Sequence, residues 1–212
     1  MMSSGRFAAL ILAVILSCDA AAYLAQAGPG LLRYAETRFG SDGRQRLMYW
    51  QRDETAIGTR PIDMPGAVLD AVNALANRVP AASDLEHWGQ GEYWATPAEF
   101  VASDGGDCED YAIAKYVALR SAGVPAGSLR LIYVKALTAQ RIENHMVLAW
   151  YPSPGAEPLI LDNLDPRVRP ASERQDLVPV YSFNDEDLGR EGVPMVRRWR
   201  DLQQRIRSER EL

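Results

Sequence analysis

The chain has 212 residues, of which 47% are apolar and 24% are charged, and its formal net charge at pH 7 is -5. That length gives room for one domain with a substantial core, and the composition is that of a soluble globular protein. No basic run is long enough to form a nucleic-acid surface, so we expect no nucleic-acid partner.

Residues 1–27 have the pattern of a secretory signal peptide. Arg6 precedes an apolar run over residues 7–16, and the Ala-Gln-Ala sequence at 25–27 supplies small residues for cleavage. The run is too short for an ordinary membrane-spanning helix. The pattern therefore predicts an exported protein.

Three alternatives remain open for this leader. Cleavage after Ala22 also fits the small residues there, an uncleaved anchor is a second reading, and Cys18 lies in a sequence that weakly resembles a lipoprotein box. If Cys18 leaves with the leader, Cys108 is the only cysteine of the mature chain. An unpaired cysteine in an exported protein indicates a reactive thiol, and the competing interpretation is a buried, inert side chain.

Helical periodicity comes first along the mature chain. It predicts short amphipathic helices over residues 31–39 and 44–52, separated by a Gly-Ser-Asp-Gly turn at 40–43. A third helix is predicted over residues 64–79, and Pro80 ends it. These helices are expected to serve as scaffold.

The next segment, residues 81–106, is expected to be irregular and is rich in aromatic residues. These side chains either plug the core beneath a loop or form a surface that grips an extended peptide: Trp88, Tyr93, Trp94 and Phe100. His87, in the same segment, is expected to be a structural or surface histidine because no helix or strand aims it.

Cys108 opens the clearest helix of the chain, predicted over residues 108–122 with Gly123 as its stop. The unpaired N–H groups and the positive dipole end of its first turn favour a thiolate. An activated nucleophile also needs a base, and His145 is a better candidate than His87.

Strands follow this helix, over residues 129–134, 144–151, 158–163 and 178–183. His145 lies in the second strand and Asp162 ends the third. Neighbouring strands can place a carboxylate behind an imidazole, where it fixes the tautomer and stabilises the charged ring. We therefore predict a catalytic triad of Cys108, His145 and Asp162 in an α+β fold.

Four motifs in this order resemble the bacterial transglutaminase-like cysteine peptidases of the LapG type. The motifs are DLEHWG at residues 84–89, YWATP at 93–97, GDCEDYA at 106–112 and NHMVL at 144–148. The resemblance covers roughly residues 38–184. It implies a papain-like or transglutaminase-like core, in which the catalytic cysteine begins a helix packed on an antiparallel sheet.

The resemblance also implies a biological role and a division of the chain. The family cleaves the amino-terminal region of a large secreted adhesin in the periplasm, at a small-residue site such as paired alanines, and so disperses biofilm. It is inhibited by an inner-membrane cyclic di-GMP receptor, which sequesters the protease in its periplasmic domain. We expect the peptidase domain over residues 28–190 and an amphipathic helical tail over 191–212 that docks on the domain, binds a partner or frays.

Acidic residues surround the predicted nucleophile. Asp107 and Asp110 fit an amino-terminal cap and its reciprocal partner. Three carboxylates would nevertheless raise the pKa of the thiol, and a bound cation would remove that conflict. The resemblance implies that Asp107 and Glu109 support calcium-dependent activity, and Ca²⁺ prefers such oxygen ligands. Asp110 is not assigned to this site.

Two other classes of function use the same residues. An acyltransferase would pass the acyl group from Cys108 to an amine instead of to water. A binding module would have lost catalysis, against which the intact Cys108, His145 and Asp162 argue. An amine acceptor and a thiol-directed electrophile separate these alternatives.

Overall fold

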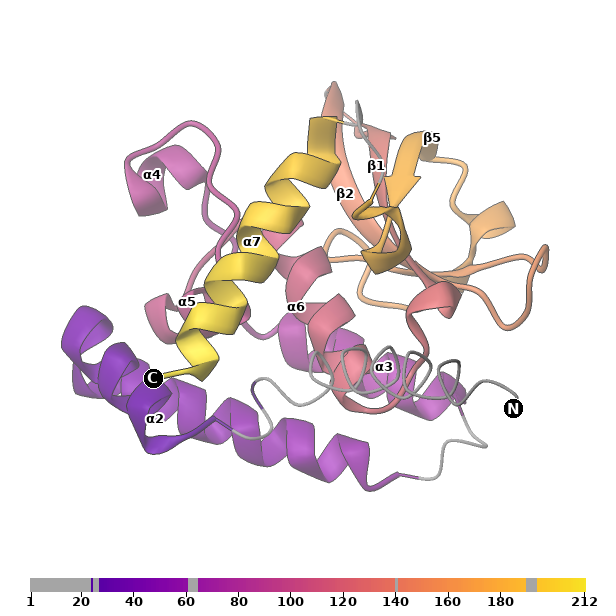
Figure 1. Ribbon diagram of the computed structural model, residues 1–212. Coiled ribbons are helices and arrows are strands. Elements are labelled where there is room, and N and C mark those ends of the chain that lie inside the picture. Colours follow the sequence, from indigo (N-terminus) through magenta and orange to yellow (C-terminus); the bar gives the residue numbers. More distant parts are fainter. Residues whose placement is uncertain (1–23, 25–26, 61–64, 140, 190–193) are drawn as a thin grey trace, which may run out of the picture.

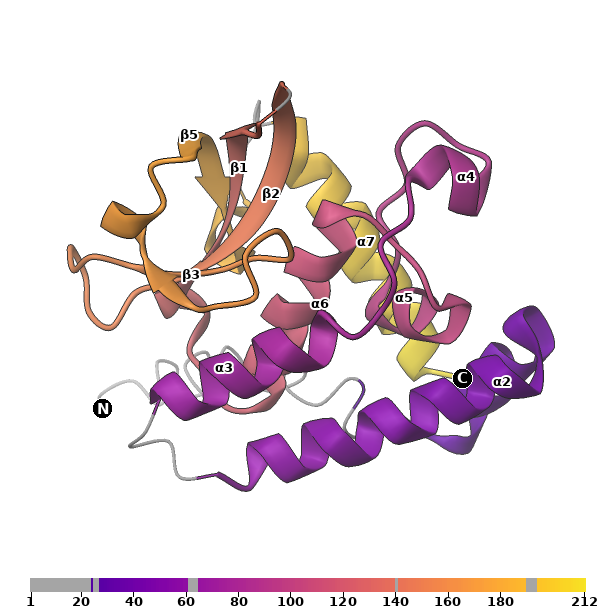
Figure 2. The same ribbon diagram turned by 180° about the vertical axis from the view of Figure 1, so that it is seen from behind.

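The computed structural model describes Leu24 and residues 27–60, 65–139, 141–189 and 194–212. Within these residues, helices gather against one five-stranded antiparallel sheet, which confirms the predicted α+β class (Figures 1 and 2). None of the described helices has the length and apolar character needed to cross a bilayer. The predicted leader lies outside the described residues except for Leu24 and Ala27.

Helices α2 (Pro29–Gly58) and α3 (Pro65–Ala76) form the base of the molecule in Figure 1. Gly40 interrupts α2 with a φ of +77°, a conformation that glycine adopts without strain. The predicted turn at 40–43 is therefore a kink at one residue, and the second helical stretch continues beyond the predicted residue 52. Of the predicted third helix, Met64 lies outside the described residues.

The prediction of an irregular segment over residues 81–106 is wrong in two places. Helix α4 (Asp84–Trp88) begins after Ser83, whose hydroxyl accepts a hydrogen bond from the Glu86 N–H. Helix α5 (Pro97–Ser103) begins after Thr96, which forms a reciprocal capping box with Glu99. Helices this short show no apolar repeat in the sequence, and capping hydrogen bonds stabilise their first turns.

Helix α6 (Cys108–Ser121) confirms the predicted helix almost to the residue. It is buried along nearly its whole length, from Asp110 to Leu119, because it runs between the sheet and the other helices. Such a helix needs apolar residues on every side, and Ala112, Ile113 and Val117 provide them. Its first residue is consequently held in a fixed position.

The sheet has the strand order β4-β3-β2-β1-β5. Strands β2 and β3 pair antiparallel, with Leu148 opposite Leu161, so the end of β3 lies beside β2 as expected. The two-residue strand β4 was not predicted. The strands are β1 (Leu129–Leu137), β2 (Ile142–Trp150), β3 (Leu159–Leu161), β4 (Arg169–Pro170) and β5 (Leu177–Phe183).

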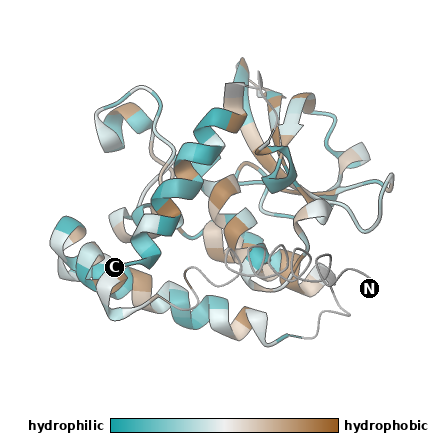
Figure 3. Cartoon of the chain, in the orientation of Figure 1, coloured by the Kyte–Doolittle hydropathy of each residue, from teal (hydrophilic) through white to brown (hydrophobic). Residues whose placement is uncertain are grey.

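The carboxyl-terminal helix α7 (Pro194–Arg210) docks on its own domain. Its apolar stripe is buried in the main core while its outward face is hydrophilic, as Figure 3 shows; the stripe consists of Val196, Trp199, Leu202 and Ile206. Arg205 donates hydrogen bonds to the Tyr93 hydroxyl at 2.7 Å and to Glu99 at 3.0 Å. The helix thus fixes the segment that precedes Cys108.

Candidate active site

Cys108 is the first residue of α6, directly after its cap. The Asp107 side chain accepts from the Glu109 N–H, and the Asp110 side chain accepts from the Asp107 N–H, so the first turn is capped in both directions. A side chain at the preceding Gly106 would meet Asp110 and Phe100 at under 3 Å, which is why the approach to Cys108 is a glycine. The thiol therefore begins a helix, as predicted.

The surroundings of the thiol keep it protonated. Burial raises the pKa of Cys108 well above its usual value, and the nearby Glu109 and Asp107 raise it further. The thiol donates a 2.7 Å hydrogen bond to Glu109 Oε2. The backbone N–H of Met146 favours the thiolate but is outweighed. The expected effect of the helix start is thus overridden by the acids around it.

His145 and Asp162 come together as predicted. Nε2 of the imidazole lies 2.7 Å from Asp162 Oδ1, and both side chains are buried. A carboxylate only accepts hydrogen bonds, so Nε2 carries the proton and Nδ1 is left with its lone pair. Cys108 begins α6, which packs against β2, the strand of His145. The complete triad stays a prediction.

The Asp162 carboxylate is satisfied by the chain itself. Besides His145, its Oδ1 accepts from the N–H groups of Asn163 and Leu164, at 2.7 and 3.1 Å. Arg174 donates to its Oδ2 at 2.6 Å. Burial alone raises the pKa of Asp162, but the hydrogen bonds from His145 and Arg174 outweigh it and hold this pKa well below its usual range.

Arg174 was missed by the sequence analysis, and no local pattern identifies it. It follows a 3-10 turn (Ala171–Glu173) in the segment between β4 and β5, outside every motif. Its contact with Asp162 exists only because the chain folds back past the end of β3.

Acidic side chains form a second cluster at the start of α6. In one group, a carboxylate oxygen from each of Asp84, Asp107 and Asp110 lies within 4.8 Å of the other two. A second group shares Asp107 and adds Cys108 and Glu109, with its ligand atoms also within 4.8 Å of one another. Asp107 and Glu109 were predicted as metal ligands, whereas Asp84 and Asp110 were not. Asp84 lies in the DLEHWG motif, so a signal for it was present.

This cluster suits a hard divalent cation. Asp84 Oδ1 is buried and has no hydrogen-bond partner among the described residues. Burial, Glu109 and Asp110 together raise the pKa of Asp107 to about 9. Buried and partly buried carboxylates that repel one another, one of them with an unpaired oxygen, are donors that suit Ca²⁺. The residues present therefore fit calcium.

The aromatic residues of the segment before Cys108 mostly pack inward. Trp94 and Phe100 belong to the core, while Trp88 and Tyr93 are half-buried against it. His87 hydrogen-bonds Ser103 Oγ at 2.8 Å, consistent with the predicted structural role. The peptide-gripping alternative therefore retains only the two half-buried side chains.

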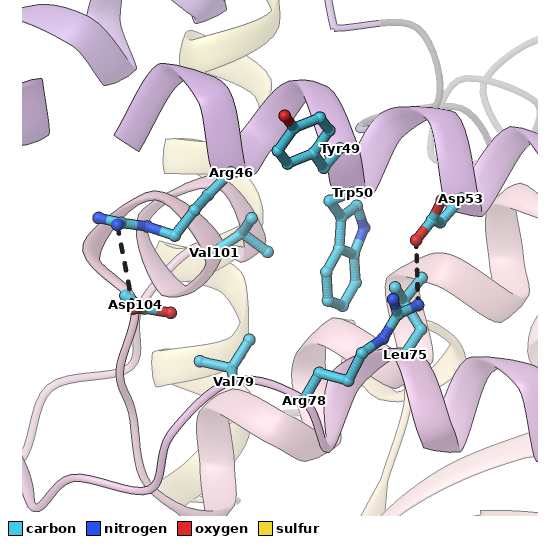
Figure 4. Close-up of a pocket in the computed structure, with 9 residues that line it drawn as sticks. All are labelled: Arg46, Tyr49, Trp50, Asp53, Leu75, Arg78, Val79, Val101 and Asp104. Carbon is cyan, nitrogen blue, oxygen red and sulfur yellow. Dashed lines mark ion pairs between the residues drawn. The ribbon is translucent and has the colours of Figure 1, made fainter. Parts of the chain in front are cut away.

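A pocket of about 150 Å³ lies elsewhere, between α2, α3 and α5 (Figure 4). Trp50 and Val101 are in its wall, and ion pairs between Arg46 and Asp104 and between Arg78 and Asp53 close its two ends. None of the predicted site residues lines it. The candidate chemistry is at the start of α6 instead.

Comparisons with known proteins define the class. Residues 51–183 match the family model described as bacterial transglutaminase-like cysteine proteinase, BTLCP. No curated protein matches the chain. The chain belongs to the family of bacterial transglutaminase-like cysteine proteinases, and a cysteine peptidase is the activity that this family supports.

Solved structures of Legionella pneumophila LapG are similar over most of both chains. The calcium-bound LapG is 36% identical with a TM-score of 0.67, covering 83% of this chain and 97% of that one. A second LapG structure is 35% identical with a TM-score of 0.66, covering 83% and 95%. An EGTA-treated LapG is 34% identical with a TM-score of 0.67 and the same coverage. The predicted resemblance to LapG-type peptidases is confirmed.

Proposed function

We propose that this chain is a calcium-dependent cysteine endopeptidase of the periplasm, which cuts the amino-terminal region of a large surface adhesin at a small-residue site. The observation that carries this proposal is the buried hydrogen bond between His145 and Asp162, in a chain of a cysteine proteinase family. His145 lies in β2, which packs against α6, the helix that Cys108 begins. Cleavage of the adhesin would release it and disperse biofilm.

In the proposed reaction, Nδ1 of His145 takes the proton of the Cys108 thiol. The resulting thiolate attacks the peptide carbonyl, and the backbone N–H of Cys108 at the helix start donates to the oxyanion. His145 then returns the proton to the departing amine, which leaves a thioester on Cys108. His145 next deprotonates a water molecule, whose oxygen attacks the thioester and releases the acid and the free thiol.

Calcium would be held by Asp84, Asp107, Asp110 and Glu109. When bound, the cation would supply positive charge that offsets the repulsion among these carboxylates. The residues then keep their ionised form without raising the pKa of the neighbouring thiol. Support comes from the free oxygen of Asp84 and from the solved LapG, which is described in a calcium-bound and an EGTA-treated form.

The proposed partners follow from the family. An inner-membrane cyclic di-GMP receptor would hold the enzyme inactive through its periplasmic domain. Export to the periplasm rests on the leader pattern of residues 1–27. These proposals require that the mature protein meets its substrate and its inhibitor in the same compartment.

The test is to incubate the mature protein with an adhesin amino-terminal fragment, in Ca²⁺ and in chelator, and to map any cut by sequencing. We expect one cut between small residues in Ca²⁺, none in chelator and none with Cys108→Ala or His145→Ala. The matched control is His87→Gln, which alters the other histidine and should cut normally.

Three results would contradict the proposal. Robust cutting by the Cys108→Ala protein would show that Cys108 is not the nucleophile. Equal cutting in chelator would show that the activity does not depend on Ca²⁺. A crosslinked product in the presence of an added amine, without cutting, would show the acyltransferase instead.

A further inference from the structure

We propose that Arg174 is a positioning residue of the peptidase, which holds the Asp162 carboxylate so that its Oδ1 accepts the hydrogen bond from His145 Nε2. The inference rests on the proposed function for its catalytic meaning, and it adds a residue to the Cys108, His145 and Asp162 set. Arg174 touches neither the thiol nor the substrate in this account, so it acts through Asp162.

The two oxygens of the Asp162 carboxylate have different hydrogen-bond partners. Oδ1 faces His145 and two backbone N–H groups, whereas Oδ2 receives Arg174 Nη2 at 2.6 Å. A carboxylate bonded at one oxygen can rotate about its Cβ–Cγ bond, because that torsion is broad. Donors at both oxygens remove this freedom. Arg174 therefore fixes the orientation in which the carboxylate plane faces the imidazole.

The guanidinium of Arg174 is itself held in place by Asp176. Its Nε and Nη2 donate to the two oxygens of Asp176 at 2.9 and 2.8 Å, a side-on fork that a planar guanidinium matches. Nη2 has two hydrogens, so it serves both Asp176 and Asp162. The backbone is pinned as well, since the Asp176 carbonyl accepts from the Leu137 N–H at 2.8 Å.

The contact between Arg174 and Asp162 is buried. The Arg174 side chain is 4% exposed and the Asp162 side chain is fully buried, while Asp176 is 43% exposed. The contact between Arg174 and Asp162 is consequently shielded from water and salt, which makes its geometry rigid. Asp176 connects this buried pair to the surface.

Lys115 of α6 also acts on Asp162, but it cannot replace Arg174. Its ammonium interacts with the carboxylate electrostatically, and burial lowers the pKa of Lys115 to about 7. Near neutral pH its charge is therefore partial. The guanidinium of Arg174 stays charged at every working pH and gives directional donors.

The first measurement needs no substrate. The chain has two histidines, His87 and His145, so ¹⁵N-histidine labelling gives a spectrum with two imidazoles. We expect a downfield Nε2–H proton from His145 in the wild type, because this N–H donates to a buried carboxylate. Arg174→Met should shift or broaden this signal, and Arg174→Lys should give an intermediate spectrum. Arg167→Met, which changes an exposed ion pair in the same segment, should leave it unchanged.

The second measurement is kinetic. We expect kcat for peptide cleavage to fall about tenfold or more in Arg174→Met, with a smaller loss in Arg174→Lys and KM within about twofold in both. If Arg174 only stabilised the fold, kcat would not depend in this order on the charge and hydrogen-bond donors at position 174. Folded Arg174→Met protein with the wild-type His145 signal and kcat would overturn the inference.

Two further outcomes also have a defined meaning. If neither Arg174 variant folds, Asp176→Asn replaces them, because Asp176 is partly exposed; an unchanged His145 signal and an unchanged kcat in this variant overturn the inference. If the wild type cleaves nothing, the proposed function fails, while a His145 signal that depends on Arg174 still supports the positioning role.

Discussion

Two sets of buried or partly buried carboxylates in this protein have opposite surroundings. Asp162 accepts hydrogen bonds from an imidazole, a guanidinium and two backbone N–H groups, and its pKa is lowered. Asp84, Asp107 and Asp110 face one another, Asp84 keeps an unpaired buried oxygen, and the pKa of Asp107 rises to about 9. The chain completes the first site by itself, whereas the second site keeps uncompensated acidic groups, which the proposed calcium ion would balance.

The difference separates what is permanent in the candidate active site from what is conditional. The histidine and its acid are held at all times by donors that belong to the fold. The thiol, in contrast, is kept protonated by burial and by the neighbouring acids, and the proposed cation would offset the contribution of the acids. Under the proposed function, such a peptidase is assembled when it folds and depends on calcium to work.

The largest effect is expected from removing the charge that supports the imidazole. Asp162→Asn should lower kcat for peptide cleavage by about 10³–10⁴-fold, because an amide gives His145 the wrong tautomer and does not stabilise its charged form. The rate should be measured in Ca²⁺ beside Asp165→Asn, a control in the same segment. Activity of Asp162→Asn within about tenfold of the wild type would argue against the triad.

The two carboxylate sites should also respond oppositely in stability. In chelator at pH 7, Asp162→Ala should destabilise the fold by about 3–5 kcal/mol, because it leaves Arg174 buried without its partner. Asp107→Asn should stabilise it by about 1 kcal/mol, because the amide keeps the helix cap and removes the proton uptake that the raised pKa of Asp107 requires on folding at pH 7. Urea unfolding measures both. Changes of the same sign would contradict the comparison.

Stability in chelator should fall as the pH rises from about 4 to about 7. Folded Asp107 and Asp110 have raised pKa values and Glu209 titrates at about 8, so the folded protein holds protons that the unfolded chain has released in this range. Above about pH 7 the lowered pKa of Lys115 works in the opposite direction. Thermal unfolding at each pH tests this; Ca²⁺ should suppress the decline, because metal binding displaces the protons.

The smallest effect concerns the support of Asp84. Ser83→Ala removes the cap of α4, which carries Asp84, and should cost about 0.5–1 kcal/mol of stability. Calorimetry should also show a Ca²⁺ affinity lowered by about twofold, compared with Ser153→Ala at an exposed position. An unchanged affinity would mean that α4 does not position Asp84 for the cation.

The sequence predicted the parts of this site that depend on local patterns. Cys108 after a glycine and an acidic cap, with helical periodicity behind it, specified a thiol at a helix start. Apolar runs with His145 inside one and Asp162 at the end of the next specified neighbouring strands. Each signal lies within one element, so propensity and periodicity suffice to read it.

The parts that were missed depend on tertiary contacts. Asp84 joins Asp107 only because α4 and the following segment fold back over the start of α6, and Arg174 meets Asp162 only because the chain turns after β4. The acids around Cys108 were expected to raise its pKa, but the larger contribution of burial was not, since it depends on how the chain packs around the thiol. Side-chain orientation is not encoded in spacing.

The most direct test of the central claim is a double-mutant cycle with His145→Ala and Asp162→Asn, in which the residual cleavage rate is measured with the enzyme in large excess over the substrate. If Asp162 works only through His145, adding Asp162→Asn to His145→Ala should cause no further loss. Losses that multiply would show that the two residues act independently, and would contradict the account of one catalytic unit serving Cys108.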